Sequence, residues 1–284
     1  MNADLHPFAD DAGTRDEHLL RQLLCEALAP AELSAGSHAS LRRRLLQRVG
    51  ESARKHAGLR TVRSGDGIWR TVRAGIAAKM LWQGPHGASV LIEFAPGASL
   101  PVHRHQHLEE GIILRGDLHL ADLQLRPGDY HVSPPGSRHG RISSRAGGLA
   151  YLRGTSLGHR QAAIGELLGG LLPGDGPAVH TCFASEEGWL SVADGVDEKL
   201  LWQDGEMRSR FLRWRPGGCL PAHVHAGDEE CMMLSGDVFF GDLLVRAGDF
   251  HLAPAGSEHG GVFSDSGAMA FVRSRGGLNM RSAR

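Results

Sequence analysis

The sequence has little of what marks a disulfide-stabilised, membrane-spanning or polyanion-binding protein. It contains 4 cysteines in 284 residues and no C-x-x-C pair, so neither a disulfide framework nor a thiol-rich zinc knuckle is expected. No apolar run approaches the length that spans a bilayer, and the N-terminus lacks the basic start and apolar stretch of a signal peptide. A formal net charge of −1 gives no overall electrostatic reason to bind nucleic acid or acidic lipid. We therefore expect a cytoplasmic protein with no nucleic-acid or membrane partner.

What the sequence does contain is a long internal repeat at a constant offset of 120 residues. The pattern G-x5-H-x-H-x3-E-x6-G, followed by G-x5-P-x-G-x2-H, occurs over residues 97–139 and again over 217–259. Identical residues continue to pair without a gap over 69–153 and 189–273. A repeat of this length exceeds a solenoid unit and indicates two tandem copies of one whole domain.

The remaining pattern predicts helices before the repeats and strands within them. Leucines at helical spacing predict a helix over 16–29, and a second, basic helix begins at Ser40. Short apolar segments separated by Gly, Pro and Asp are typical of an all-β fold. The predicted division is a helical N-terminal extension (1–60), a first β domain (61–156), a linker with a short helix (157–180) and a second β domain (181–284).

Each copy of the repeat supplies three imidazoles and one carboxylate at fixed spacing. Two histidines at i and i+2 lie on one face of a strand, because side chains alternate with period two. The Glu begins the next strand, and the P-x-G turn returns a third histidine towards the same interior. The predicted metal ligands are His103, His105, Glu109 and His139 in the first copy and His223, His225, Glu229 and His259 in the second.

The ligand set predicts two divalent transition-metal sites per chain. Three nitrogens and one oxygen suit zinc, iron, manganese, cobalt, nickel or copper, and we take zinc as the first expectation. If the coordination number exceeds four, the remaining positions face the barrel lumen and can take water, dioxygen or a small-molecule ligand.

Residues beside the ligands carry secondary predictions. Strand alternation turns the second acids, Glu110 and Glu230, away from the ligands. His131 and His251 are either partners that orient a ligand or strand histidines outside the site.

Cys231 is the clearest chemical difference between the copies, because the first copy has Gly111 at that position. The thiol either points towards the second site or is an inert, buried side chain. The first alternative would make the two sites chemically unequal.

The two repeated motifs resemble the two conserved cupin motifs, and the match covers both halves of the chain. The resemblance implies a bicupin of two double-stranded β-helix (jelly-roll) barrels. Two motifs are similar to those of ChrR-type cupins: L-P-x-H-x-H-x3-E-E at residues 100–110, and the G-D-x-H and G-S-x-H elements within 128–139. That group includes the zinc-binding C-terminal domain of ChrR anti-sigma factors and small iron dioxygenases.

The N-terminal region resembles ChrR proteins only in part. Residues 29–34 and the basic helix after them look like the linker that precedes the ChrR cupin. The ChrR head carries a zinc-binding H-x3-C-x2-C signature, whereas this region offers Cys25 with His6 and His18.

Three functions follow as hypotheses. The first is a regulatory or sensor bicupin that acts in transcription regulation and contacts a sigma factor or another protein through the N-terminal helices. The second is a non-haem metal-dependent dioxygenase acting on a small diketone or phenolic ketone. The third is a metal-binding structural protein. Apolar helix stripes and open sheet edges also favour a homodimer.

Overall fold

The computed structural model describes residues 11–28 and 34–276, and the chain divides into two compact units, with the boundary between Lys55 and His56. The first unit contains helices α1 (Asp11–Ala27) and α2 (Ala35–Lys55), so both predicted N-terminal helices are confirmed. Helix α2 begins five residues before the predicted start, because the Ser34 hydroxyl accepts a hydrogen bond from the Ser37 N–H and caps the helix. Residue 29, the predicted end of the first helix, lies outside the described residues.

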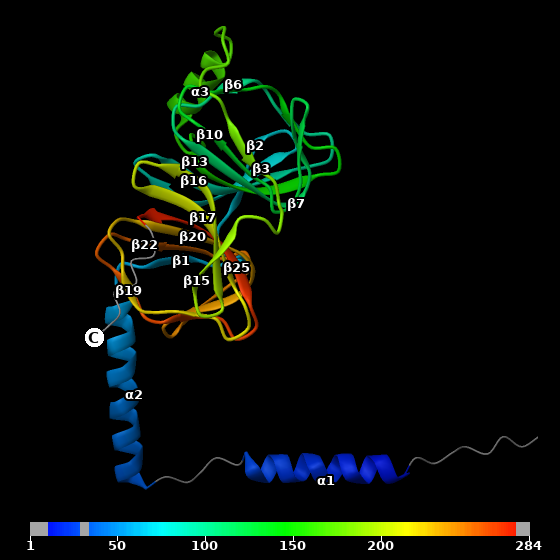
Figure 1. Ribbon diagram of the computed structural model, residues 1–284. Coiled ribbons are helices and arrows are strands. Elements are labelled where there is room, and N and C mark those ends of the chain that lie inside the picture. Colours follow the sequence, from blue (N-terminus) through cyan, green and yellow to red (C-terminus); the bar gives the residue numbers. More distant parts are fainter. Residues whose placement is uncertain (1–10, 29–33, 277–284) are drawn as a thin grey trace, which may run out of the picture. The chain divides into compact units, whose positions relative to one another are not determined.

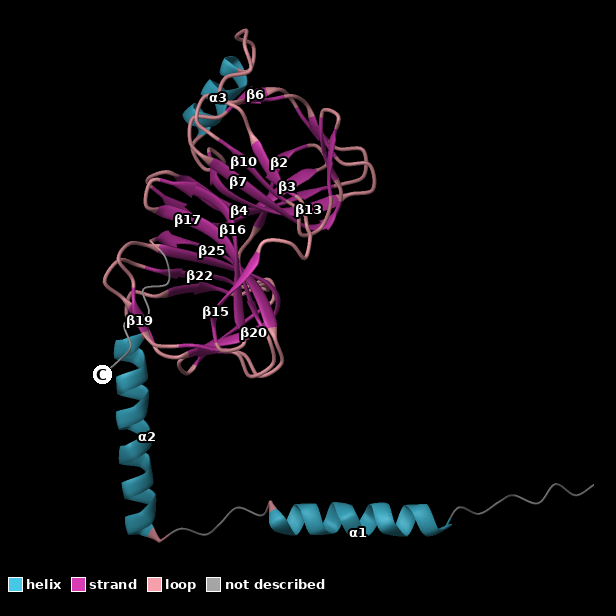
Figure 2. Cartoon of the chain, in the orientation of Figure 1, coloured by secondary structure: helices cyan, strands magenta, loops and turns pink. Residues whose placement is uncertain are grey.

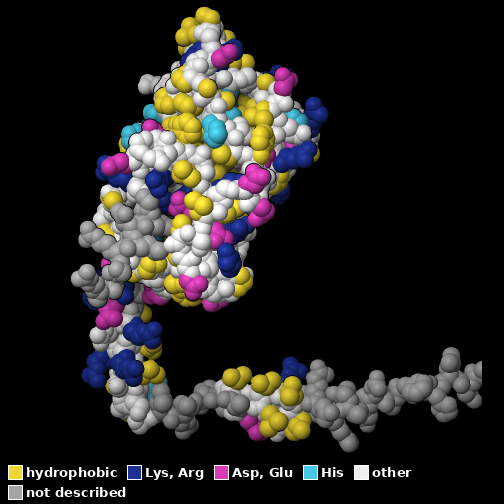
Figure 3. All heavy atoms as spheres, in the orientation of Figure 1, with side chains coloured by type: hydrophobic (Ala, Val, Ile, Leu, Met, Phe, Trp, Pro, Cys, Tyr) yellow, Lys and Arg dark blue, Asp and Glu magenta, His cyan; other side chains and the backbone are white. Residues whose placement is uncertain are grey.

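Both N-terminal helices keep an exposed apolar stripe (Figure 3). On α2 no residue is buried, and the leucines of its stripe lie beside a basic face that includes Arg42, Arg43, Arg44 and Arg48. Within the described residues, no helix is long and apolar enough to cross a membrane. The exposed side chains of the stripes are Leu19, Leu20, Leu23, Leu24 and Leu28 on α1 and Leu41, Leu45, Leu46 and Val49 on α2.

The second unit holds two β-barrels, as the repeat predicts (Figures 1 and 2). In barrel 1 a seven-stranded antiparallel sheet runs in the order β14-β10-β7-β13-β4-β3-β2. A smaller sheet runs in the order β5-β12-β8-β9, and β6 pairs with β11 at the end of the barrel. The strands are β2 (Trp69–Arg73), β3 (Ile76–Gly84), β4 (Gly87–Phe94), β5 (Ser99–Leu100), β6 (His103–Arg104), β7 (Glu109–Gly116), β8 (Leu118–Leu120), β9 (Leu123–Leu125), β10 (Tyr130–Ser133), β11 (Arg138–His139), β12 (Ile142–Ser143), β13 (Gly148–Thr155) and β14 (His180–Cys182).

Barrel 2 repeats this arrangement, and its main sheet runs in the order β1-β22-β20-β25-β17-β16-β15. The short helix predicted between the copies is α3 (Arg160–Gly169). The strands of barrel 2 are β1 (Arg60–Val62), β15 (Trp189–Ala193), β16 (Val196–Asp204), β17 (Met207–Trp214), β18 (Cys219–Leu220), β19 (His223–Val224), β20 (Glu229–Phe240), β21 (Leu243–Arg246), β22 (Phe250–Ala253), β23 (Glu258–His259), β24 (Val262–Phe263) and β25 (Ala268–Arg275).

The two barrels exchange their first strands. Strand β1 precedes barrel 1 in the chain but pairs with β22 of barrel 2, where Thr61 lies opposite His251. Strand β14 precedes barrel 2 but pairs with β10 of barrel 1, where Thr181 lies opposite His131. The predicted boundaries at residues 60 and 180 follow the order of the chain. They do not follow the sheets, because the strand at each boundary pairs with the other barrel.

Glycine is required at one close backbone approach in each barrel. The last glycine of the first repeated motif, Gly116, has a φ of +73°, and a Cβ there would collide with the carbonyl oxygen of Gly147. Gly236 has a φ of +69° and meets Gly267 in the same way. Only glycine adopts this backbone conformation at no steric cost, which explains why both copies of the motif have glycine at this position.

Three apolar cores support the second unit. One fills barrel 1 around Ile92 and Phe94, and one fills barrel 2 around Trp214 and Phe240. The third joins the large sheets of the two barrels, where Tyr151 and Phe271 pack with ring centroids 5.7 Å apart. The barrels are therefore held together by a shared core as well as by the exchanged strands.

Two buried carboxylates cross this interface in a reciprocal pattern. Glu110 of barrel 1 contacts Arg273 of barrel 2 at 3.0 Å, and Glu230 of barrel 2 contacts Arg153 of barrel 1 at 2.9 Å. Both acids point away from the ligands, as alternation predicts, but they are buried between the barrels and not exposed to solvent. Glu230 also accepts a hydrogen bond from Ser89.

We expect Arg273→Met to destabilise the protein by roughly 3–5 kcal/mol, because it leaves the carboxylate of Glu110 buried beside a more distant cation. Urea unfolding monitored by fluorescence measures the free energy. The double variant Arg273→Met/Glu110→Leu should recover much of the loss, since no charge is then left without its partner. A single variant as stable as the wild type would contradict this role.

Candidate metal centres

In barrel 1 strand pairing brings the predicted ligands together. His103 lies opposite His139 in the β6–β11 ladder, and His105 follows β6 directly. The ring centroids are 4.9 Å apart for His103 and His105, 4.6 Å for His105 and His139, and 5.5 Å for His103 and His139. Glu109 begins β7, and its Oε1 lies 3.8 Å from His105 Nδ1.

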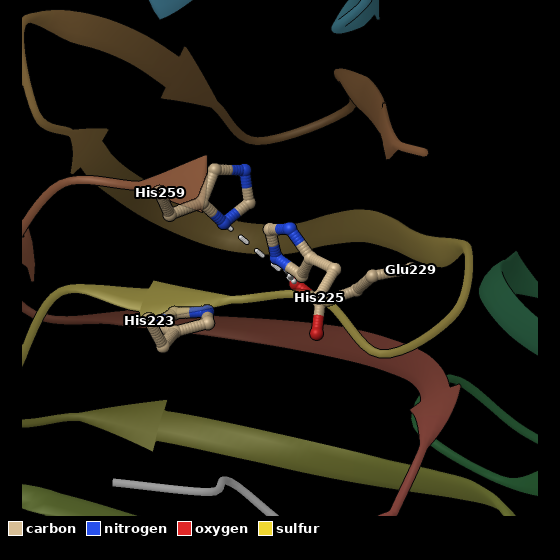
Figure 4. A group of neighbouring side chains, drawn as sticks. All are labelled: His223, His225, Glu229 and His259. Carbon is tan, nitrogen blue, oxygen red and sulfur yellow. Dashed lines mark ion pairs between the residues drawn. The ribbon is translucent and has the colours of Figure 1, made fainter. Parts of the chain in front are cut away.

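Barrel 2 gathers all four predicted ligands (Figure 4). His223 lies opposite His259 in the β19–β23 ladder. Glu229 Oε1 lies 3.5 Å from His225 Nε2 and 3.8 Å from His259 Nδ1. One ligand atom from each of the four residues lies within 4.8 Å of the others, whereas in barrel 1 this holds for the three histidines without Glu109.

Unpaired buried nitrogens show that the clusters fit a metal ion. His105 Nε2 and His139 Nδ1 in barrel 1, and His225 Nε2 and His259 Nδ1 in barrel 2, are buried with no hydrogen-bond partner. A buried polar atom without a partner costs free energy, and a bound divalent ion would remove that cost in both barrels. Imidazole nitrogens with one carboxylate are a donor set that suits such ions. The eight residues thus remain predicted ligands, and the described geometry is compatible with that prediction.

Two histidines that the sequence left open lie directly behind the clusters. His131 Nε2 lies 3.1 Å from His139 Nε2, and His251 Nε2 lies 3.0 Å from His259 Nε2. The other nitrogen of each ring meets a threonine hydroxyl on an exchanged strand: Thr181 at 2.8 Å from His131 and Thr61 at 2.9 Å from His251. These contacts fix the orientation of the ligand rings, as hydrogen-bonding partners do in known metal sites.

Burial keeps most of these imidazoles neutral, which is the form that binds metal. Burial, assisted by the neighbouring imidazoles, lowers the pKa of His139 and of His259 to about 2. It lowers the pKa of His105, His131 and His251 to about 4.

The two carboxylates differ in their electrostatic surroundings. Burial raises the pKa of Glu109, against smaller opposing effects of His103 and of a hydrogen bond with Thr155. Burial alone would raise the pKa of Glu229 too, but the His225 imidazole, whose Nε2 lies 3.5 Å from Oε1, together with His259 and Arg210, lowers it to about 2. Glu229 is therefore the more firmly ionised of the two.

Arg210 lies at the candidate site of barrel 2 but was not predicted from the sequence. Its side chain is 1% exposed, and its Nη2 lies 3.9 Å from Glu229 Oε2. The equivalent residue in barrel 1 is Val90. A basic residue within the apolar strand R-F-L-R-W was the available signal, but strand alternation did not show that it points inward.

Barrel 1 encloses a cavity of about 260 Å³ that reaches the candidate ligands. The polar part of its wall contains His103, Glu109, His139, Ser133 and Thr155. Most of the remaining wall is apolar, formed by Ile92, Phe94, Leu100, Gly111, Ile113, Leu118, Leu120, Leu125, Ile142, Leu152 and Leu157.

Two of the positions that line this cavity carry larger side chains in barrel 2, and a third carries the longer, unbranched Met233. Gly111, Ile113 and Leu120 correspond to Cys231, Met233 and Phe240, which pack into the core of barrel 2. The Phe240 ring lies 4.3 Å from the His259 ring, between centroids. Burial raises the pKa of the Cys231 thiol, so it is an inert member of this core at neutral pH.

The metal-free protein should lose stability as the pH falls below 6.5. The unfolded chain binds a proton on each histidine near pH 6.5, but the folded protein keeps His131, His251, His139 and others neutral to about pH 4 or lower. Their contribution is therefore complete above pH 6.5 and is lost at roughly 1.4 kcal/mol per pH unit per histidine as the pH falls. Urea unfolding of chelator-treated protein at pH 7, 6 and 5 measures the slope. His251→Asn should reduce it, and a slope of zero in the wild type would contradict the assignment.

Solved structures with the same fold include enzymes, at low sequence identity. A "putative dioxygenase" from Nostoc punctiforme is 15% identical, with a TM-score of 0.60 over 79% of this chain and 85% of that chain. Oxalate decarboxylase from Lactobacillus farciminis, in a formate complex, is 15% identical, with a TM-score of 0.55 over 76% and 86%. A deletion mutant of the Bacillus subtilis oxalate decarboxylase is 19% identical, with a TM-score of 0.53 over 76% of each chain. These likenesses show a shared bicupin fold.

The search of the curated proteins gave no match. The family model described as the ChrR Cupin-like domain matches twice, at residues 58–156 and 178–276, which together exceed half of the chain. Each match contains one complete set of candidate ligands. The chain therefore belongs to the ChrR cupin-like family and carries its domain twice.

Proposed function

We propose that this protein is a metal-dependent enzyme of the cupin dioxygenase type, in which barrel 1 binds a small, largely apolar molecule beside its metal ion. The observation that carries the proposal is the 260 Å³ cavity of barrel 1, which reaches His103, Glu109 and His139. A cavity of roughly 150 Å³ accommodates benzene, so this one has room for a small diketone or phenolic ketone. The Nostoc punctiforme protein described as a "putative dioxygenase" shares this fold, which supports the same proposal.

The residues of barrel 1 have separate tasks in this proposal. His103, His105, His139 and Glu109 hold the ion, while the apolar wall excludes water and orients the ligand. When bound, a divalent ion supplies Lewis acidity and open coordination positions.

Barrel 2 is proposed to hold a metal ion for structure. Phe240, Met233 and Cys231 fill its interior, and Arg210 lies against Glu229. Zinc, iron, manganese and nickel are all compatible with these ligands; manganese gains support from the Mn(II) centres of the B. subtilis oxalate decarboxylase.

Metal analysis of single-site variants tests the ligand assignment. We expect two ions per chain in the wild type and about one in His103→Ala and in His223→Ala, since each loses one of four donors. Inductively coupled plasma mass spectrometry of the purified proteins measures the ratio. Two ions retained in both variants would show that the ligand sets are wrong.

Oxygen consumption separates catalysis from structural metal binding. The iron-loaded wild type is expected to consume dioxygen with an added diketone or phenolic ketone, and His103→Ala should lose at least about 100-fold of that rate. His223→Ala should keep most of it if it remains folded, because barrel 2 is not the proposed reaction site. Equal losses in both variants with intact folds would contradict the division between the barrels.

The second candidate is a regulatory protein that contacts a sigma factor, and the exposed stripe of α2 favours it. Leu41, Leu45 and Leu46 are exposed on a helix with no buried residue. Such a stripe suits a protein partner or a second copy of the chain in a cytoplasmic homodimer.

For this candidate, a sigma factor should co-purify with the full chain and be lost on deletion of residues 1–55 or in Leu45→Glu. Arg54→Glu, elsewhere on the same helix, is the matched control and should retain the complex. Absence of any sigma factor from the full-length complex would reject this version of the regulator.

A further inference from the structure

Helix α3 is held close to the strand that carries the first candidate ligand (Figure 1). Arg104 Nε donates a hydrogen bond to the Gly169 carbonyl at 3.2 Å, and Gln106 Nε2 donates one to the Ala162 carbonyl at 3.2 Å. After the helix, Gly170 approaches so closely that a Cβ would lie 2.7 Å from the Val102 carbonyl oxygen. The position of α3 over this end of barrel 1 is therefore specific.

Glu166 extends from α3 to the cavity of barrel 1. The residue is 9% exposed and lines the cavity together with Ala163 and Leu167. Its Oε1 accepts hydrogen bonds from the Gln106 N–H at 3.1 Å and the Ser156 hydroxyl at 2.7 Å. Among the described residues, no hydrogen bond ends on Oε2. The carboxylate is thus fixed in the cavity wall through one oxygen.

The cavity wall combines two carboxylates with an apolar surface. Glu109 neutralises part of the charge of a bound ion, which leaves Glu166 as an additional negative charge. The lining also holds one arginine, Arg73, which is exposed to solvent, whereas Glu166 is buried. Because solvent screens an exposed charge more than a buried one, Glu166 has the stronger effect on a ligand inside.

We propose that Glu166 sets the charge selectivity of barrel 1, favouring neutral ligands, above all hydrogen-bond donors, and disfavouring anions. This inference rests on the proposed function, because it takes barrel 1 as the ligand site. An anion inside the cavity is repelled by the fixed carboxylate, whereas a hydroxyl or N–H group can donate to it. A glutamine would preserve a carbonyl acceptor for Gln106 and Ser156 but would remove the charge.

The test uses cobalt-loaded protein and two small metal-binding probes of different charge. The parent protein carries His223→Ala, which removes a ligand of barrel 2 so that cobalt binds only in barrel 1. The visible absorption of cobalt then reports on barrel 1 alone. Azide is the anionic probe and imidazole is the neutral one. Adding Glu166→Gln should strengthen azide binding by roughly tenfold, from the loss of one like charge in a partly screened site, and change imidazole binding by less than about twofold. Glu187→Gln, which removes the same charge from an exposed turn, should change neither.

A second variant leaves every contact of Glu166 in place. Leu167→Lys adds a positive charge to a half-exposed position of the cavity wall and should also strengthen azide binding relative to imidazole. If Glu166→Gln is folded and the ratio of azide to imidazole affinity is unchanged, charge selectivity by Glu166 is wrong although barrel 1 still binds ligands. If Glu166→Gln does not fold, an unchanged ratio in Leu167→Lys overturns the proposal. If neither probe alters the parent spectrum, the metal has no open position in barrel 1, and the proposed function fails as well.

Discussion

Buried imidazole nitrogens that lack hydrogen-bond partners destabilise a folded protein, and each barrel places two of them at the centre of a histidine cluster. The rest of the structure is arranged around these clusters. Short strands set His103 against His139 and His223 against His259, and His131 and His251 fix the rings from behind. The low pKa values of His139 and His259 keep these two rings unprotonated at neutral pH, so they can bind a cation without first releasing a proton.

The two barrels share the same set of three histidines and one glutamate, but the residues around that set differ. In barrel 2 the Phe240 ring packs against His259, and Arg210 lies beside Glu229. Side chains of this barrel therefore occupy space beside the ligands and place a positive charge next to the carboxylate. In barrel 1 the smaller Leu120 lines an open cavity, and α3 adds Glu166 to the wall of that cavity. A duplicated protein can in this way keep one site for stability and leave the other for a ligand.

Much of the fold and of the candidate site could be predicted from the sequence, because ligand spacing and strand alternation are local properties. The tandem barrels, the N-terminal helices and the proximity of the histidines all followed from such patterns. The exchanged strands did not, since residues 60–62 and 180–182 give no local sign of which sheet they join. Arg210 and Glu166 were missed for a related reason. Their positions depend on the inward phase of β17 and on the docking of α3, which are set by tertiary contacts.

The exchange of β1 and β14 bears on how such a chain arose. In this chain the β10 edge of barrel 1 and the β22 edge of barrel 2 are each covered by the first strand of the other copy. Two identical copies would satisfy each other, which is the isologous, strand-swapped dimer that twofold symmetry allows. The reciprocal Glu110–Arg273 and Glu230–Arg153 pairs have this same twofold relation. Fusion of two genes would turn such a dimer into one chain and free each half to mutate independently, which is how one barrel could fill while the other stayed open.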